Sequence, residues 1–247
     1  MSGKPELLLK LLSIPIFLLL TFEPLSFNTF AAHKNPCLTC HKNYKKPTKN
    51  IHPALDIGCE ACHVTVQGKE HPKHEDSVKL RYDVPGLCYN CHKESKFKGS
   101  DVHSPVAGGM CTSCHDAHRS DFKKLLINEP PELCYGCHKK AKFTQKYSHL
   151  VALNGCGRRC HNPHASDKPY LLSLGVNDVC TGCHKAQETG RHIVSLPKGH
   201  IHPVKGFPDP EKPTKELSCA SCHNPHSSNF ERLFASRKKW KRCHEFY

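Results

Sequence analysis

The sequence has too few apolar side chains to build an ordinary hydrophobic core. Hydrophobic residues make up 37% of its 247 residues and aromatic residues 8%, and 19 prolines and 15 glycines are scattered among them. Such a chain could not bury enough apolar surface to offset the conformational entropy lost on folding. A conventional globular domain is therefore excluded, and another component must supply the core.

The one long apolar run lies at the amino terminus. Lys4 and Lys10 precede an apolar segment at 11–22, and small residues follow it. This order is typical of a secretory signal peptide, which we place at residues 1–32. The alternative is an uncleaved membrane anchor, but Glu23 ends the segment before the roughly 20 apolar residues that a span requires. No cysteine follows the expected cleavage site, so a lipid anchor is not expected.

Cysteine and histidine take the place of apolar residues, with 17 and 21 copies. Sixteen of the cysteines form eight motifs in which two cysteines are followed directly by a histidine. In chain order, motifs 1 to 8 are Cys37, Cys40 and His41; Cys59, Cys62 and His63; Cys88, Cys91 and His92; Cys111, Cys114 and His115; Cys134, Cys137 and His138; Cys156, Cys160 and His161; Cys180, Cys183 and His184; and Cys219, Cys222 and His223.

The spacing of these motifs suits covalent haem attachment. Positions i and i+3 share one face of a helical turn, so two thiols can bond the two vinyl groups of one porphyrin while the adjacent histidine ligates its iron. Zinc sites also use Cys-x-x-Cys pairs, but they do not require a histidine after every second cysteine. Cysteines this close together also make poor disulfide staples. The eight motifs therefore predict eight haems c.

Two places depart from the pattern. Cys156 and Cys160 are separated by three residues, which still leaves both on one helical face. Cys243 is followed by His244, but Trp240 stands where the first cysteine of a ninth motif would be. Only one thioether could form there, so a ninth haem is not expected.

The motifs are arranged in doubled repeats. A lone motif at 37–41 precedes four repeats at about 52–92, 103–138, 149–184 and 202–244, and together they form one predicted multihaem domain at 33–247. The last repeat has the defective second motif. A proline-rich segment, 196–217, precedes it and is interpreted as a solvated connector or a docking loop.

The second axial ligand of each iron decides between electron transfer and catalysis, because an open position can bind substrate. Four candidate histidines lie upstream of the first motif in a doubled repeat, and three follow a motif histidine by three residues. The upstream candidates are His52, His103, His149 and His202, and the downstream candidates are His118, His164 and His226. In the first repeat, Val66 occupies the downstream position, and either His71 or His74 could serve instead.

This selection gives eight candidates for eight haems. It leaves His33, His192, His200 and one of the His71/His74 pair as spare surface histidines. Which histidine serves which iron is not readable from spacing. The haem of motif 1 belongs to no doubled repeat, so its ligand comes from elsewhere in the chain or from His33.

The formal net charge of +14 would normally indicate an acidic partner such as nucleic acid or lipid. Each haem, however, adds about two propionates and, when oxidised, about one positive charge at iron. Eight haems would bring the total to about +6 when oxidised and about −2 when reduced. Most lysines and arginines then pair with propionates, so no nucleic acid is expected and membrane contact is at most peripheral.

The repeat unit resembles that of the doubled-motif multihaem c-type cytochromes. The resemblance rests on His103-Ser-Pro-Val106 and on the Cys-His-x-Pro-His form at His161 to His164 and His223 to His226. The resemblance covers nearly all of the chain after residue 32. Over this length the chain is similar to periplasmic octahaem cytochromes of metal-respiring bacteria, some of which belong to porin–cytochrome conduits. The resemblance implies stacked bis-histidine haems that carry electrons across the periplasm or outer membrane. Membership of a conduit is implied by analogy only.

The predicted fold is mostly α with little regular secondary structure, in which short helices and loops wrap a stacked multihaem core. Longer helices are expected only at 121–128 and 229–241. The predicted function is periplasmic electron transfer in anaerobic respiration, without catalytic residues. The expected donor is an inner-membrane quinol-oxidising cytochrome, and the acceptor is an outer-membrane conduit or an extracellular acceptor.

Two rival functions remain open. A multihaem reductase of small nitrogen or sulfur oxyanions would need an open or lysine-ligated haem, and the sequence contains no Cys-x-x-Cys-Lys. A cytochrome filament would need haem contact between subunits, with the basic tail at 237–242 as a docking segment.

Overall fold

The computed structural model describes residues 35–157, 159–189, 192, 204–209 and 211–236. These residues belong to one unit that begins at Asn35. The predicted signal peptide, the defective ninth motif and the basic tail lie outside the described residues, as do His33, His200 and His202. Within the described ranges, none of the helices has the length and hydropathy of a membrane span.

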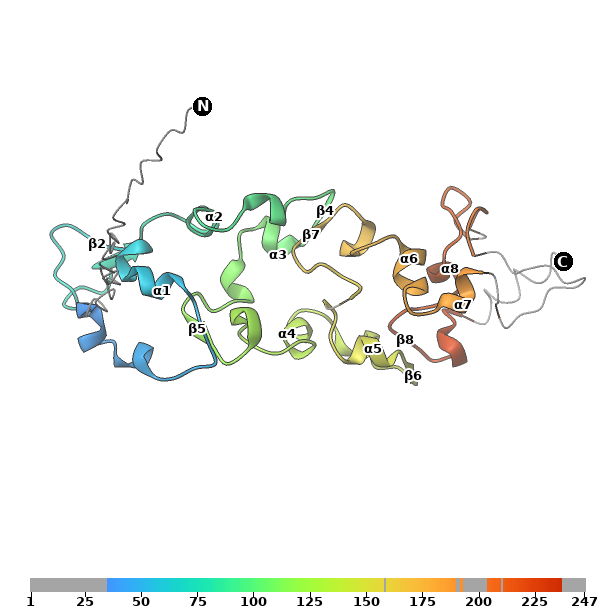
Figure 1. Ribbon diagram of the computed structural model, residues 1–247, viewed down its shortest axis with the longest axis horizontal. Helices are drawn as coiled ribbons and strands as arrows, with labels where there is room; N and C mark the ends of the chain where they lie inside the picture. Colours follow the sequence, from blue (N-terminus) through green and yellow to red (C-terminus); the bar gives the residue numbers. More distant parts are fainter. Residues whose placement is uncertain (1–34, 158, 190–191, 193–203, 210, 237–247) are drawn as a thin grey trace, which may run out of the picture. The chain divides into compact units, whose positions relative to one another are not determined.

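The helices are short and are joined by loops (Figure 1). The α-helices are α1 Ala54–Ile57, α2 Gly86–Tyr89, α3 Ser104–Ala107, α4 Glu132–Tyr135, α5 Leu150–Leu153, α6 Val176–Thr181, α7 Lys185–Glu188 and α8 Cys219–Cys222. The 3-10 helices are η1 Pro36–Thr39, η2 Lys42–Lys45, η3 Cys59–Ala61, η4 Glu94–Phe97, η5 Cys111–Ser113, η6 Lys123–Leu125, η7 Lys140–Lys142, η8 Pro169–Leu171 and η10 Glu231–Leu233. The prediction of a mostly helical chain with little regular structure is confirmed.

The expectation of longer helices at 121–128 and 229–241 is wrong for the described residues. Each segment holds only a three-residue 3-10 helix, η6 or η10. The cause is a left-handed pair in each, since Lys124 and Leu125 have φ of 60° and 57°, and Arg232 and Leu233 have φ of 55° and 59°. Left-handed residues cannot continue a right-handed helix.

The strands form four antiparallel pairs of two or three residues each. They are β1 Asn50–Ile51, β2 His63–Thr65, β3 Val78–Leu80, β4 Asp101–Val102, β5 Arg119–Ser120, β6 Tyr147–Ser148, β7 Ala165–Ser166 and β8 Ser227–Ser228. The pairs are β1–β5, β2–β3, β4–β7 and β6–β8. Only β2–β3 is a local hairpin. The other three join segments from different doubled repeats, as β4 and β7 in Figure 1 illustrate.

The described residues contain almost no apolar core. Their only buried apolar side chains are Ala165 and Leu217, whereas large apolar side chains such as Ile57, Leu150 and Tyr170 are exposed. The polypeptide alone therefore leaves its apolar side chains without the packing partners that a folded protein normally provides.

The proline-rich segment before motif 8 is folded against α6 over its described part. Asn177 in α6 donates to the Val204 carbonyl at 2.9 Å and accepts from the Cys219 amide at 2.9 Å. The Leu217 amide donates to the Phe207 carbonyl at 2.7 Å, which closes the segment into a turn. This anchoring places Cys219 beside the helix that carries motif 7.

Candidate functional site

Most motifs form one helical turn that presents both thiols and the histidine together. In six motifs the histidine amide donates to the carbonyl of the first cysteine at 2.9–3.1 Å; these histidines are His41, His92, His115, His138, His184 and His223. None of the sixteen motif cysteines, all of which the structure describes, is joined in a disulfide. The local structure is the one that a two-thiol attachment needs.

Each motif histidine faces one further histidine, which we call its partner histidine. The interplanar angles range from 8° to 48°. By ring-centroid distance, the pairs are His41 with His71 (5.9 Å), His63 with His118 (6.1 Å), His92 with His52 (6.1 Å), His115 with His164 (6.0 Å), His138 with His103 (6.1 Å), His161 with His226 (6.0 Å), His184 with His149 (6.1 Å) and His223 with His192 (6.1 Å).

This spacing fits one metal ion between the two rings. A metal–imidazole bond is about 2 Å long and each nitrogen lies about 1 Å from its ring centre, so two opposed ligands have centroids about 6 Å apart. No cluster of three or more metal-ligating side chains occurs among the described residues. The protein thus offers two imidazoles to each ion and leaves the remaining positions to a cofactor. A porphyrin bonded to the adjacent thiols meets that requirement.

Hydrogen bonds at Nδ1 leave Nε2 free to ligate. A carbonyl oxygen can only accept, so an Nδ1 that lies against one must carry the proton, and the Nε2 lone pair is then available. Six rings make this contact at 2.8–3.0 Å: His52 to Ala117, His103 to Pro163, His149 to Pro225, His115 to Lys124, His161 to Tyr170 and His223 to Arg232. These six rings are in the tautomer that a metal ligand needs.

The left-handed pairs supply three of these carbonyls. Lys124, Tyr170 and Arg232 each have φ near 60° and are followed by a leucine that is also left-handed. In each case the carbonyl of the first left-handed residue accepts a hydrogen bond from Nδ1 of the preceding motif histidine. The same backbone device therefore orients the histidines of motifs 4, 6 and 8.

The three long-range strand pairs hold partner histidines from different repeats together. The His52 amide donates to the His118 carbonyl at 2.8 Å, directly after the β1–β5 pair. Equivalent bonds join His103 to His164 at 2.9 Å and His149 to His226 at 2.8 Å. Each upstream histidine faces the second motif of its own repeat, whereas each downstream histidine faces the first motif of the preceding repeat.

The downstream histidines are held neutral by their surroundings. Burial lowers the pKa of His118, of His164 and of His226, because the cationic form is poorly solvated there. A neutral imidazole is the form that binds a metal. Beside His118, burial raises the pKa of Asp116, but amide hydrogen bonds from His118 and Arg119 outweigh it and lower that pKa. Asp116 is therefore ionised at neutral pH.

Consecutive motifs approach one another through their cysteines. Hydrogen bonds join the first cysteines of motifs 1 and 2, 3 and 4, 5 and 6, and 7 and 8: Cys37 to Cys59, Cys88 to Cys111, Cys134 to Cys156, and Cys180 to Cys219. Between these pairs, burial raises the pKa of Cys88, of Cys114 and of Cys160, and the nearby thiols of Cys62, Cys137 and Cys183, respectively, raise it further. The eight attachment sites thus follow one another in chain order, and the longer motif at Cys156 keeps its place in the series.

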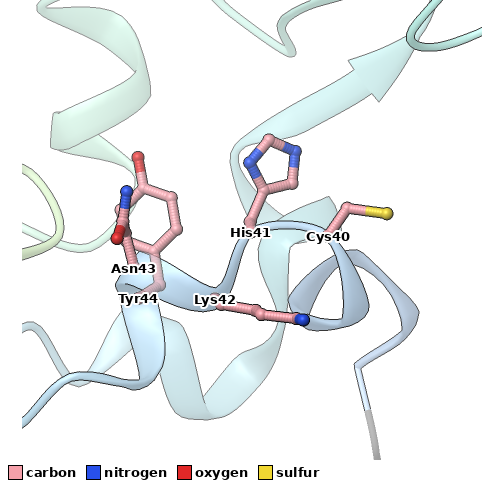
Figure 2. Close-up of a pocket in the computed structure, with 5 residues that line it drawn as sticks. All are labelled: Cys40, His41, Lys42, Asn43 and Tyr44. Carbon is pink, nitrogen blue, oxygen red and sulfur yellow. The ribbon is translucent and has the colours of Figure 1, made fainter.

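Motif 1 borders an open pocket of about 280 Å³. Figure 2 shows the Cys40 thiol, the His41 imidazole and the Tyr44 ring projecting from this one turn of chain. Tyr44 lies 6.2 Å from His41 and 4.9 Å from His118 by ring centroids. It therefore lies beside the motif histidine of motif 1 and the partner histidine of motif 2.

Most ligand candidates from the sequence occur in these pairs. His52, His103, His149, His118, His164 and His226 each face a motif histidine, and His71 rather than His74 faces His41. His202 lies outside the described residues. Sequence reasoning missed His192, which faces His223 although it was grouped with the spare histidines. This histidine lies outside the positions that recur in the repeats, so the spacing of the motifs did not indicate it.

Comparison with known proteins identifies the repeat. The family model described as a doubled CXXCH motif matches residues 103–143, 149–189 and 212–245. These matches cover the second, third and fourth doubled repeats and indicate covalent binding of haem c. The residues of the first repeat and of motif 1 lie outside them. No curated protein matches the chain.

Proposed function

The chain carries the doubled CXXCH motif of multihaem c-type cytochromes, and from this premise we propose that it is a periplasmic electron carrier with eight haems. It takes electrons from an inner-membrane quinol-oxidising cytochrome and passes them to an outer-membrane conduit or an extracellular acceptor. The sixteen motif cysteines hold the haems, and the eight histidine pairs ligate the irons. A bound haem supplies a one-electron couple at its iron.

The continuous approach of consecutive attachment cysteines is the observation that carries the proposal. Cys37 reaches Cys59 and Cys180 reaches Cys219, with equivalent contacts between these ends. Since each cysteine bonds a porphyrin edge, neighbouring thiols bring neighbouring porphyrin edges close together. The polypeptide thereby sets one path through the whole series rather than several isolated centres.

Histidine on both sides of each iron favours electron transfer over substrate binding. All eight motif histidines have a partner ring at 5.9–6.1 Å, and carbonyl bonds at Nδ1 hold six of the sixteen rings in the ligating tautomer. The residues thus exclude substrate from the irons at rest, which speaks against a reductase of nitrogen or sulfur oxyanions.

Basic side chains without acidic neighbours suit the propionates. The chain has 36 lysines and arginines against 22 aspartates and glutamates. Lysine–carboxylate ion pairs in the described residues involve only Lys69, Lys73, Lys98 and Lys140. Periplasmic placement is supported by the signal-peptide pattern at 1–32 and by the chemistry of thioether attachment, which takes place outside the bacterial cytoplasm.

Haem content and ligation are tested on the purified full-length protein. Intact mass and pyridine haemochrome absorbance should give eight haems per chain, and electron paramagnetic resonance of the oxidised protein should show low-spin iron only. A smaller haem number, or high-spin signals from several haems, would overturn the octahaem assignment. A catalytic reduction current with nitrite or sulfite on an electrode would instead support the reductase.

The single path is tested with a photoreductant at one end. In a Cys243→Ser background, which removes the one cysteine outside the eight motifs, a cysteine introduced by Lys212→Cys carries the label, since the motif cysteines are blocked by haem. Repeated flashes should reduce all haems in one fast phase. With motif 5 removed by Cys134→Ala, Cys137→Ala and His138→Ala, the fast phase should stop at the haems of motifs 6 to 8. An unchanged fast phase would show that electrons do not follow the series.

A further inference from the structure

We propose that His71 is a displaceable ligand, so that the haem of motif 1 takes up a small ligand such as carbon monoxide, nitric oxide or cyanide. The other seven haems remain closed. This inference rests on the proposed function, because it requires a haem attached at Cys37 and Cys40. It adds a ligand-exchange site to a chain whose remaining irons only transfer electrons.

Exposure separates His71 from the other partner histidines. It is exposed, whereas His52, His103, His118, His149, His164, His192 and His226 are all half-buried. On the other side of the pair, His41 and Cys40 are exposed as well, and Pro36–Thr39 (η1) contains no buried residue. A small ligand can therefore reach this position from solvent.

His71 is also held by fewer bonds. Its described anchor is a 3.0 Å contact between Nδ1 and the Ser77 hydroxyl. By contrast, the His103 ring donates to the Pro163 carbonyl at 3.0 Å and its amide donates to the His164 carbonyl at 2.9 Å, next to a strand pair. Pulling His103 away breaks bonds between two repeats, whereas moving His71 breaks one bond within its own loop.

Aromatic packing further distinguishes His71 from the three downstream histidines. Tyr44 lies 4.9 Å from His118, Phe97 lies 5.1 Å from His164 and Phe143 lies 5.0 Å from His226 by ring centroids. Each aromatic ring holds the imidazole in place by edge or tilted contact. Among the described residues, the ring contact of His71 is with His41 itself.

The loop that carries His71 is built to open locally. It connects β2 to β3, and its residues 70–76 are all exposed. Its ion pairs, Lys69 with Asp76 and Lys73 with Glu70, are solvent-exposed, and exposed pairs of this kind contribute little to stability. Segments with few buried contacts open at low free energy without global unfolding. Loop opening can therefore carry His71 away while the β2–β3 hairpin remains paired.

The exchange is a ligand substitution without redox change. The bond from His71 Nε2 to iron breaks, its electron pair stays on nitrogen, and the incoming ligand donates a pair to the vacated position. Neither iron nor ligand changes oxidation state in this step. His74 lies in the same loop and is the competing ligand that could recapture the iron.

The test uses the full-length haem-loaded protein with carbon monoxide as the probe. After dithionite reduction, about one haem in eight should bind carbon monoxide, at a rate that becomes independent of carbon monoxide concentration because His71 must leave first. In His71→Ala the same single haem should bind carbon monoxide, now at a rate proportional to concentration. Ser77→Ala should raise the limiting rate several-fold without adding a second site.

His103→Ala is the matched control. It should add a second carbon monoxide site, at motif 5, to the one already present. Absence of binding to the wild type would overturn the inference, and so would a second site in His71→Ala, since the wild-type site would then lie elsewhere. If the peptide that contains Cys37 and Cys40 carries no haem by mass spectrometry, the proposed function fails at this motif instead.

Discussion

The imidazole of His226 faces that of His161 at a centroid distance of 6.0 Å, although the two residues belong to different doubled repeats. His164 and His118 make the same reach toward the first motif of the preceding repeat. A doubled repeat is therefore a unit of sequence but not a unit of ligation. In the first three doubled repeats, the histidine of the first motif faces a histidine from the repeat that follows.

Replacing His226 with alanine should open the haem of motif 6 and no other. His226 is the sole histidine that faces His161 among the described pairs, so its loss leaves the iron with one axial imidazole. About one haem in eight should become high-spin in the oxidised protein. Electron paramagnetic resonance of the purified variant gives this count. His74→Ala, which alters an exposed histidine outside the pairs, should leave all haems low-spin.

The location of the open haem is checked by a second variant. When motif 6 is removed with Cys156→Ala and Cys160→Ala, adding His226→Ala should produce no high-spin signal. A persistent signal would mean that His226 serves a motif of its own repeat, contrary to the cross-repeat arrangement.

Gly99→Ala should weaken the junction between the second and third repeats. A Cβ at Gly99 would lie 2.6 Å from the Ser166 carbonyl oxygen, next to the β4–β7 pair. Separating these backbones should lower the free energy of unfolding by about 1–3 kcal/mol. Urea unfolding of the haem-loaded protein, followed by Soret absorbance, measures the shift in midpoint. Gly86→Ala, with no atom within 4 Å of the new Cβ, is the control and should change stability by less than about 0.5 kcal/mol. Equal midpoints would contradict the predicted clash.

Lys124→Gly should stabilise the protein rather than destabilise it. Lys124 has φ of 60°, and its useful group is the carbonyl that accepts from His115. Glycine keeps that carbonyl and removes the left-handed strain of about 1 kcal/mol. Chemical denaturation of both variants distinguishes this from a general effect, because Lys123→Gly, at a residue without positive φ, should cost about 0.5–1 kcal/mol. If both glycines destabilise the protein equally, the left-handed residue carries no strain.

The sequence predicted the elements that are local. A cysteine pair and its histidine need one helical turn, so the motifs could be placed by spacing alone. The upstream and downstream histidines could likewise be found because they recur at similar places in each repeat. Which motif each of these histidines faces could not be predicted, because it depends on strand pairs such as β1–β5 that join residues far apart in sequence.

The two exceptional partner histidines were harder for a different reason. His71 and His192 face the motif histidines at the two ends of the described series, and neither stands at a position that recurs in the other repeats. No recurrence marks them. The left-handed pairs were also missed, because Lys124 and Tyr170 are ordinary residues whose φ is imposed by the bond to the motif histidine rather than by local propensity.

The cross-repeat ligation has a consequence for how such a chain can change in length. Duplicating an internal repeat leaves every motif histidine with a partner histidine, because the new copy supplies one histidine to the preceding repeat and receives one from the repeat that follows. Deleting an outer segment does not, since loss of motif 1 leaves His71 facing no motif histidine and loss of the fourth repeat leaves His161 without His226. Duplication of an internal repeat therefore preserves the histidine pairing, whereas loss of an outer segment breaks it.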